Sequence, residues 1–203
     1  IILWTNGLLL DNMTPDAWQQ IDGIVVSVYP SVAYPKDVTN LQPLLDKYSV
    51  WLRKRYCPEF VRGSTTREIT NRRLVQYIYD TCTEAHYFEG HTIRDGRYFK
   101  CVQAAYASIR LAAYGVAFDN VADDSVRILD NCDLERDIRN YLNSQLPLMA
   151  CRYCLGDIGR WHTHRQRNSP LTIDPVDMDI RELINNDVIL PECFFNDNTR
   201  DME

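Results

Sequence analysis

The stretch Gly23-Ile-Val-Val-Ser-Val-Tyr-Pro30 decides the fold class of this chain. Its apolar run between Gly23 and Pro30 is typical of a strand that is buried on both faces of a parallel sheet. Ser27 interrupts the run, and a buried hydroxyl group needs a hydrogen-bond partner, which the backbone can supply. We therefore expect a central strand over residues 24–29.

Strand and helix patterns alternate on both sides of this strand. A strand over residues 1–4 ends in the turn Thr5-Asn6-Gly7, and Thr14-Pro15-Asp16 starts a short helix, with proline at the first helical position. After the central strand, a helix over residues 37–48 leads to a third strand over residues 50–56. This order predicts an α/β fold in which helices pack outside a parallel sheet.

Ligands of such sheets and barrels bind at the carboxyl ends of the strands. Four side chains fall at these ends: Asn6, Ser27, Tyr29 and Arg55. Asn6 has a simpler role, because Asn and Gly tolerate positive φ and the pair Asn6-Gly7 suits a turn. Ser27 is harder to explain by local structure alone.

Four cysteines form the strongest functional pattern: Cys82, Cys101, Cys151 and Cys154. Residues 86–89 and 97–100 predict the two strands of a β-hairpin around the turn Asp95-Gly96, which would bring Cys82 close to Cys101. Cys151 and Cys154 form a Cys-x2-Cys loop that lets two sulfurs bind one metal centre. We expect one shared four-cysteine metal site.

Three other interpretations of these cysteines stay open. Disulfide scaffolds are typical of short secreted chains, whereas this chain has 203 residues and 7 Cys. A structural zinc ion uses the same four thiolates, although zinc sites commonly pair two short knuckles, and here one half spans a hairpin. Unliganded core cysteines are the third, and they are our expectation for Cys57, Cys132 and Cys193. The spacing favours an iron–sulfur cluster over zinc.

Composition excludes several classes of partner. The hydrophobic content of 45% suffices for a packed core, and the net charge of −6 gives no basic surface for nucleic acid. The longest apolar runs are far shorter than the roughly 20 residues that a spanning helix needs. No signal-peptide pattern is present. We expect a cytoplasmic setting without nucleic-acid or membrane partners.

Helical patterns continue between Cys101 and the Cys-x2-Cys loop. We predict helices over residues 102–114, ended by Gly115, and 133–146, with an acidic surface segment over residues 119–130 between them. His162 and His164 follow the loop, and because four Cys already complete a tetrahedral site, we expect hydrogen-bonding or surface roles for both.

These residues resemble the radical S-adenosylmethionine (radical SAM) enzymes. Thr5-Asn6-Gly7 and Val25-Val-Ser-Val28 look like the third and fourth strands of their partial (β/α)6 barrel. The cysteine pattern is similar to the twitch domain, a shortened SPASM domain that follows the barrel and holds an auxiliary four-iron four-sulfur (4Fe–4S) cluster. Gly96 to Cys101 and Cys151 to Cys154 match its Gly-x4-Cys and Cys-x2-Cys elements.

The resemblance implies a domain organisation. Residues 1–78 would be the C-terminal part of the barrel, residues 79–168 the α+β twitch domain with its hairpin, and residues 169–203 a tail. The Cys-x3-Cys-x2-Cys motif of radical SAM enzymes is absent from this sequence. Because the chain also opens at Ile1 directly on a strand, we expect it to be a fragment of a longer protein. We expect that this fragment by itself does not cleave SAM.

The resemblance also implies a function, that of a radical SAM oxidoreductase. Its auxiliary 4Fe–4S cluster, on Cys82, Cys101, Cys151 and Cys154, would transfer electrons during oxidation or modification of a small-molecule or peptide substrate. The intact enzyme would use SAM, a second 4Fe–4S cluster and an electron donor such as flavodoxin or ferredoxin. Ser27 and Asn6 would contact SAM, and the catalytic residues are not identified.

Non-enzymatic functions stay open beside this one. One is a zinc-stapled interaction domain, in which the four Cys hold the hairpin to the Cys-x2-Cys loop. Another is a degenerate radical SAM relative that binds a partner. A third is a peptide-binding domain that adds a strand to an exposed hairpin edge near residues 87–92.

Overall fold

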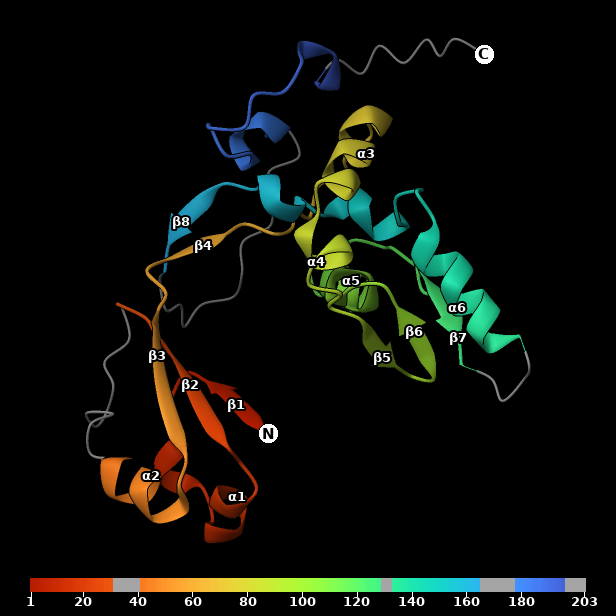
Figure 1. Cartoon of the computed structure of the whole chain (residues 1–203). Coiled ribbons are helices and arrows are strands. Elements are labelled where there is room, and N and C mark those ends of the chain that lie inside the picture. The colour runs from red at the N-terminus through yellow and green to blue at the C-terminus, as the bar shows by residue number, and fades with distance from the viewer. Residues whose placement is uncertain (31–40, 129–132, 165–177, 196–203) are drawn as a thin grey trace. The chain divides into compact units, whose positions relative to one another are not determined.

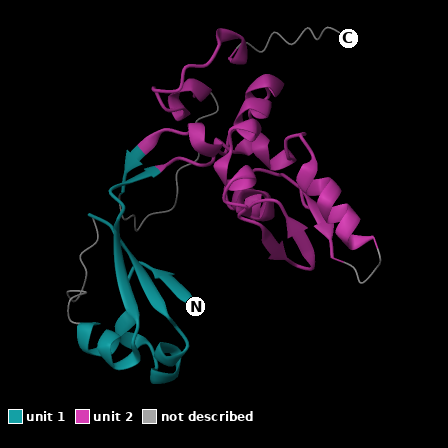
Figure 2. Ribbon diagram, in the orientation of Figure 1, with its two compact units in different colours: residues 1–60, 162–170 teal, residues 61–161, 171–203 magenta. Residues whose placement is uncertain are grey.

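The computed structural model describes residues 1–30, 41–128, 133–164 and 178–195 (Figure 1). The chain divides into two compact units (Figure 2). Unit 1 comprises residues 1–60 and 162–170, and unit 2 comprises residues 61–161 and 171–203. The domain boundaries implied by the family resemblance, at residues 78 and 168, stay a prediction.

Unit 1 is built on a three-stranded parallel sheet of order β1-β2-β3. The strands are β1 (Ile2–Thr5), β2 (Gly23–Val28) and β3 (Trp51–Tyr56), joined through α1 (Pro15–Gln19) and α2 (Gln42–Tyr48). A short 3-10 helix, η1 (Leu10–Asn12), precedes α1. The predicted parallel α/β arrangement is confirmed at this level. A partial barrel stays a prediction, and residues 37–40 of the predicted helix lie outside the described residues.

The core of unit 1 lies between this sheet and its helices. Its buried members are Leu10, Trp18, Ile24, Val26, Leu41, Leu45 and Val50. Alternate residues of β2 enter this core, and Val25, on the other face, is also buried. Gly23 is required at its position, because a Cβ atom there would lie 2.0 Å from the ring of Trp51.

Unit 2 contains most of the remaining secondary structure. Its strands are β5 (Thr92–Arg94), β6 (Arg97–Phe99) and β7 (Ser125–Arg127). Strands β4 (Glu59–Val61) and β8 (Trp161–Thr163) pair in a separate two-stranded sheet, and their residues are divided between the two units. The α-helices are α3 (Arg72–Asp80), α4 (Thr83–His86), α5 (Val102–Ala112) and α6 (Leu134–Asn143). The 3-10 helices are η3 (Met149–Tyr153), η4 (Gly156–Ile158), η5 (Ile180–Leu183) and η6 (Glu192–Phe194). The helices predicted over residues 102–114 and 133–146 are confirmed as α5 and α6.

The hairpin has the predicted turn but not the predicted first strand. Asp95 and Gly96 have φ values of 50° and 69°, as a two-residue hairpin turn of type I′ requires. The strand before the turn is β5, which pairs with β6 in antiparallel register. The strand predicted over residues 86–89 was wrong, because α4 extends to His86 and Glu89 has a φ of 49°. The edge for strand addition expected near residues 87–92 is likewise wrong, since only Thr92 is in a strand.

The acidic segment before α6 is not a surface segment throughout. Its residues 125–127 form β7, which joins the hairpin sheet through β6. Arg97 of β6 donates a hydrogen bond from Nε to Oγ of Ser125, at 2.6 Å. Asn120 and Asp124 are fully buried. The prediction of a surface segment was wrong for these residues, because their polar side chains find hydrogen-bond partners inside unit 2, whereas Asp119 and Asp123 are exposed as predicted. Residues 129 and 130 of the predicted segment lie outside the described residues.

Two clusters of buried apolar side chains stabilise unit 2. The first joins α3 to the 3-10 helices and consists of Ile69, Leu74, Val75, Ile78, Leu155, Ile158, Leu183 and Ile184. The second surrounds α5 and consists of Phe99, Cys101, Ala104, Ala105, Ala107 and Ala150. Among the described residues, no helix is both long and apolar enough to cross a membrane.

Candidate metal centre

Cys82, Cys101, Cys151 and Cys154 line one cavity of unit 2, of about 220 Å³. Apolar side chains, among them Ile78 and Ala85, form much of the remaining wall. The thiols are free, as are all six cysteines that the structure describes. The structure thus brings together the four residues that the sequence predicted as one site.

Two of the four cysteines stand at helix N-termini. Cys82 is the N-cap residue of α4, and Cys101 is the N-cap residue of α5. The sulfur of Cys101 accepts a hydrogen bond from the backbone N–H of Ala104 at 3.4 Å. Helix N-termini present unpaired N–H groups and a positive partial charge, both of which stabilise a thiolate. These N–H groups therefore offset part of the effect by which burial raises the pKa values of Cys82 and Cys101.

The Cys-x2-Cys loop is formed by η3 and the residues after it. The sulfur of Cys154 accepts a hydrogen bond from the N–H of Gly156 at 3.3 Å and lies 3.1 Å from the carbonyl oxygen of Gly63. Gly156 has a φ of 50°, and a Cβ atom there would lie 3.3 Å from the carbonyl oxygen of Ile78, in α3. This glycine therefore lets the loop take a left-handed turn close to α3.

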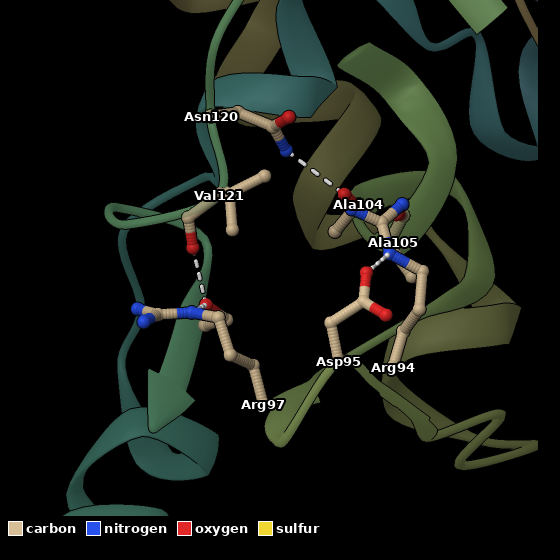
Figure 3. Close-up of polar contacts among 8 residues, drawn as sticks. Arg94, Asp95, Arg97, Ala104, Ala105, Asn120 and Val121 are labelled. Atoms are coloured by element: carbon tan, nitrogen blue, oxygen red, sulfur yellow. Dashed lines mark hydrogen bonds and ion pairs between the residues drawn. The ribbon is translucent and has the colours of Figure 1, made fainter. Parts of the chain in front are cut away.

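The carboxylate of Asp124 forms hydrogen bonds with the first two residues of η3. Its Oδ1 accepts from the N–H of Met149 at 2.6 Å, and its Oδ2 accepts from the N–H of Ala150 at 2.8 Å. Nδ2 of Asn120 donates to the same Oδ2 at 2.6 Å. It also donates to the carbonyl of Ala104, in α5, at 2.9 Å (Figure 3). The Asn120–Asp124 pair thus connects α5, which carries Cys101, to the segment that carries Cys151.

Burial disfavours the charged form of all four thiols. It raises the pKa of Cys101 to about 11 and that of Cys154 to about 12. Burial, together with charge on Cys154 and Cys101, holds the pKa of Cys151 well above its usual range, and burial also raises the pKa of Cys82. The metal-free site therefore holds protonated thiols at neutral pH, and metal binding must displace these protons.

Lys100, directly before Cys101, is a buried cation beside this site. Its side chain donates hydrogen bonds to the hydroxyl oxygen of Tyr79 and, at 3.3 Å, to the carbonyl of Ser144. Burial lowers the pKa of Lys100, whereas negative charge on Cys151 and Cys101 raises it. Tyr79 itself lines the cavity, and burial raises its pKa to about 12. The sequence did not indicate that Lys100, Tyr79 and Asp124 lie near the four cysteines.

The four thiols do not converge on a position for a single ion. Among the described residues, no three Cys, His, Asp or Glu side chains are grouped closely enough to hold one metal ion. A zinc ion with Zn–S bonds of about 2.3 Å would need sulfurs about 3.8 Å apart. A 4Fe–4S cluster is larger and takes one thiolate on each of its four irons.

The predicted SAM contacts lie in unit 1. Oδ1 of Asn6 accepts a hydrogen bond from the N–H of Leu8 at 3.1 Å, and Gly7 has a φ of 81°, which confirms the turn role of this pair. Ser27 is partly buried in β2, where it stands opposite Arg55 of β3. A contact of either residue with SAM stays a prediction.

The two histidines after the loop make ring contacts rather than lining the cavity. His164 stacks on Tyr29 with 4.6 Å between ring centroids, and His162 lies 6.4 Å from Phe60 by the same measure. Neither histidine is among the residues that line the four-cysteine cavity.

Three further cysteines were predicted as core residues. Cys132 lies outside the described residues, Cys57 is partly buried, and Cys193 is exposed, so the prediction was wrong for Cys193.

No protein-family model matches this chain, and a search of curated proteins finds no match either. The resemblance to radical SAM enzymes therefore depends on the sequence motifs alone.

Proposed function

We propose that unit 2 holds a 4Fe–4S cluster on Cys82, Cys101, Cys151 and Cys154. One observation carries this proposal: the four cysteines, separated by up to 72 positions in the sequence, line a single cavity of about 220 Å³. The cavity has an apolar wall, and the N–H groups of Ala104 and Gly156 donate to two of the sulfurs. Both features suit a cluster site, because apolar surroundings and hydrogen bonds to sulfur influence the reduction potential of a cluster.

The cluster would transfer electrons rather than bind substrate. With a protein thiolate on each iron, no coordination position is open, and such a cluster supplies one-electron chemistry when bound. The chain's own residues hold the four sulfurs, exclude water with apolar side chains and donate backbone hydrogen bonds to sulfur. This arrangement suits an auxiliary cluster that accepts an electron from a substrate.

We further propose that the whole protein is a radical SAM oxidoreductase. The support is the agreement between two independent features: the parallel strands of unit 1 and the Gly-x4-Cys and Cys-x2-Cys elements of unit 2. SAM, a second 4Fe–4S cluster, a small-molecule or peptide substrate, and a flavodoxin or ferredoxin donor belong to this proposal. A Cys-x3-Cys-x2-Cys motif upstream of Ile1 in the natural reading frame would support it, and an open reading frame without that motif would contradict it.

The cluster itself is tested by metal content. The chain is purified without oxygen, and iron, sulfide, zinc and the visible spectrum are measured for the native protein and the Cys151→Ala variant. We expect about four irons per chain and a brown colour, both lost in the variant. Cys193→Ala is the matched control, because Cys193 is exposed and does not line the cavity, and it should keep the cluster.

Three outcomes would overturn this proposal. Colourless protein with about one zinc per chain, lost on chelation, would make the site a structural zinc staple. Protein that takes up neither metal would leave four buried core thiols. Equal iron loss in Cys151→Ala and Cys193→Ala would place the cluster elsewhere.

A further inference from the structure

Lys100 is buried to a degree that is unusual for lysine. Only 2% of its surface is exposed, although lysine is almost never fully buried without a charged partner. It follows β6 directly and precedes Cys101, so its position in the chain is fixed by the hairpin on one side and by α5 on the other. A cation held here needs a stabilising partner.

The groups that contact the side chain of Lys100 are all neutral. Its Nζ donates to the hydroxyl of Tyr79 and to the carbonyl of Ser144, and it lies 4.9 Å from the centroid of the Tyr79 ring. Within the described part of the chain, no carboxylate forms an ion pair with it. Hydrogen bonds and a cation–π contact offset only part of the cost of burying an ammonium group.

The groups that can supply the missing negative charge are cysteines. Tyr79, whose hydroxyl oxygen accepts from Nζ of Lys100, lines the same cavity as Cys101 and Cys151. These cysteines become thiolates when a metal or cluster binds. A bound cluster would therefore bring negative charge to this buried cation.

We propose that Lys100, held by Tyr79, is the counter-ion of the iron–sulfur cluster and raises its reduction potential. This inference depends on the proposed cluster. Reduction adds one electron and makes or breaks no bond, so the reduced site carries one more negative charge than the oxidised site. A fixed positive charge in a poorly screened interior stabilises the reduced form more, and net charge is one of the factors that set cluster potentials. Lys100 would therefore favour the electron-accepting role.

The test is a spectroelectrochemical titration of the loaded protein, with dithionite as the electron donor. Lys100→Met removes the charge and keeps a side chain of similar length, Lys100→Gln removes the charge and keeps a hydrogen-bond donor, and Lys100→Arg keeps both. We expect both neutral variants to shift the equilibrium toward the oxidised cluster at least tenfold, about 59 mV for one electron. Lys100→Arg should remain close to the native value.

The outcomes separate this inference from the proposed function. A native protein without a cluster would overturn both. A native cluster whose potential does not change in Lys100→Met or Lys100→Gln would overturn the inference alone. If the neutral variants fold but take up no cluster while Lys100→Arg does, the counter-ion role is supported. If all three variants are unfolded in the metal-free state, Lys100 is a structural residue and the inference is wrong.

Discussion

The carboxylate of Asp124 accepts a hydrogen bond from the backbone N–H of Ala150, with 2.8 Å between Oδ2 and N. The neighbouring N–H of Met149 donates to the other oxygen. The first N–H groups of a helical segment have no partner within that segment, and the N-cap residue of η3, Leu148, has no polar side chain to supply one. Asp124 therefore acts as a cap from a distant part of the chain and fixes the segment that carries Cys151.

The first prediction concerns this cap. Asp124→Ala leaves two N–H groups without their acceptor, and each unsatisfied buried group costs about 1–3 kcal/mol. We expect the free energy of unfolding of the metal-free protein, measured by urea denaturation, to fall by roughly 2–4 kcal/mol. Metal content should fall as well. Asp123→Ala is the control, since Asp123 is exposed, and equal stability of the two variants would show that Asp124 is not a cap.

The second prediction is a pH dependence with the same origin. Burial raises the pKa of Asp124, and the hydrogen bonds from Asn120, Ala150 and Met149 oppose this only in part. A carboxyl whose pKa is raised in the folded state contributes stability that is present below the unfolded value, near 3.9, and is lost as pH rises through the folded value.

We therefore expect native protein to gain stability relative to Asp124→Asn as pH is lowered from 7 toward 4. The asparagine variant has no titratable group at this position. The contributions of the other titrating groups therefore cancel in the difference between the two free energies of unfolding. The measurement is a series of urea denaturations of both metal-free proteins across this range. A difference that stays constant or has the opposite slope would mean that Asp124 is ionised in the folded protein throughout.

Local patterns explain how much of the fold was predictable. β2 and its flanking elements follow from the apolar run after Gly23, because each strand and turn there is specified by adjacent residues. The turn Asp95-Gly96 was found for the same reason, since both residues suit positive φ. The first hairpin strand was misplaced because residues 86–89, His-Tyr-Phe-Glu, are rich in aromatic side chains, which strands favour, while the strand that pairs with β6 begins at Thr92.

The site was predictable in its ligands and not in their surroundings. Cysteine spacing indicates shared binding because few other arrangements use four thiols. The burial of Asp124 depends on N–H groups 25 and 26 positions further along the chain, and nothing in its acidic segment distinguishes it from exposed Asp123. Lys100 likewise has the sequence context of an ordinary hairpin residue, and only its tertiary contacts with Tyr79 and Ser144 set it apart.

The third prediction concerns the close approach of Gly23 and Trp51 in unit 1. A Cβ atom at Gly23 would lie 2.0 Å from the Trp51 ring, a distance that requires the ring to move. Overpacking of this kind typically costs about 1–3 kcal/mol. We expect Gly23→Ala to lower the free energy of unfolding by that amount, measured by denaturation followed by tryptophan fluorescence.

A double-mutant cycle isolates this contact. Trp51→Ala removes the ring, so adding Gly23→Ala in that background should cost less than in the native protein, with a coupling of at least about 0.5 kcal/mol. Additive effects of the two changes would show that the cost of Gly23→Ala comes from the strand backbone. Iron content should be the same in all four proteins, because the four ligands belong to unit 2.

The fourth prediction concerns removal of the metal. The four thiolates would hold η3, α4 and α5 to one centre when the cluster is bound. Their release removes this restraint, while Met149–Tyr153 keeps its hydrogen bonds to Asp124, Thr65 and Ile69. Binding free energy at such sites contributes to folding, so the segment that carries two ligands should open more often once the cluster is lost. We expect hydrogen exchange, followed by mass spectrometry, to show at least tenfold faster exchange over residues 148–155 after the cluster is removed.

Exchange over β2 should not change, because that strand belongs to unit 1 and contributes no ligand. Unchanged exchange over residues 148–155 would mean that the loop is held by Asp124 and the apolar core alone, whereas faster exchange in β2 as well would mean that the cluster stabilises the whole chain.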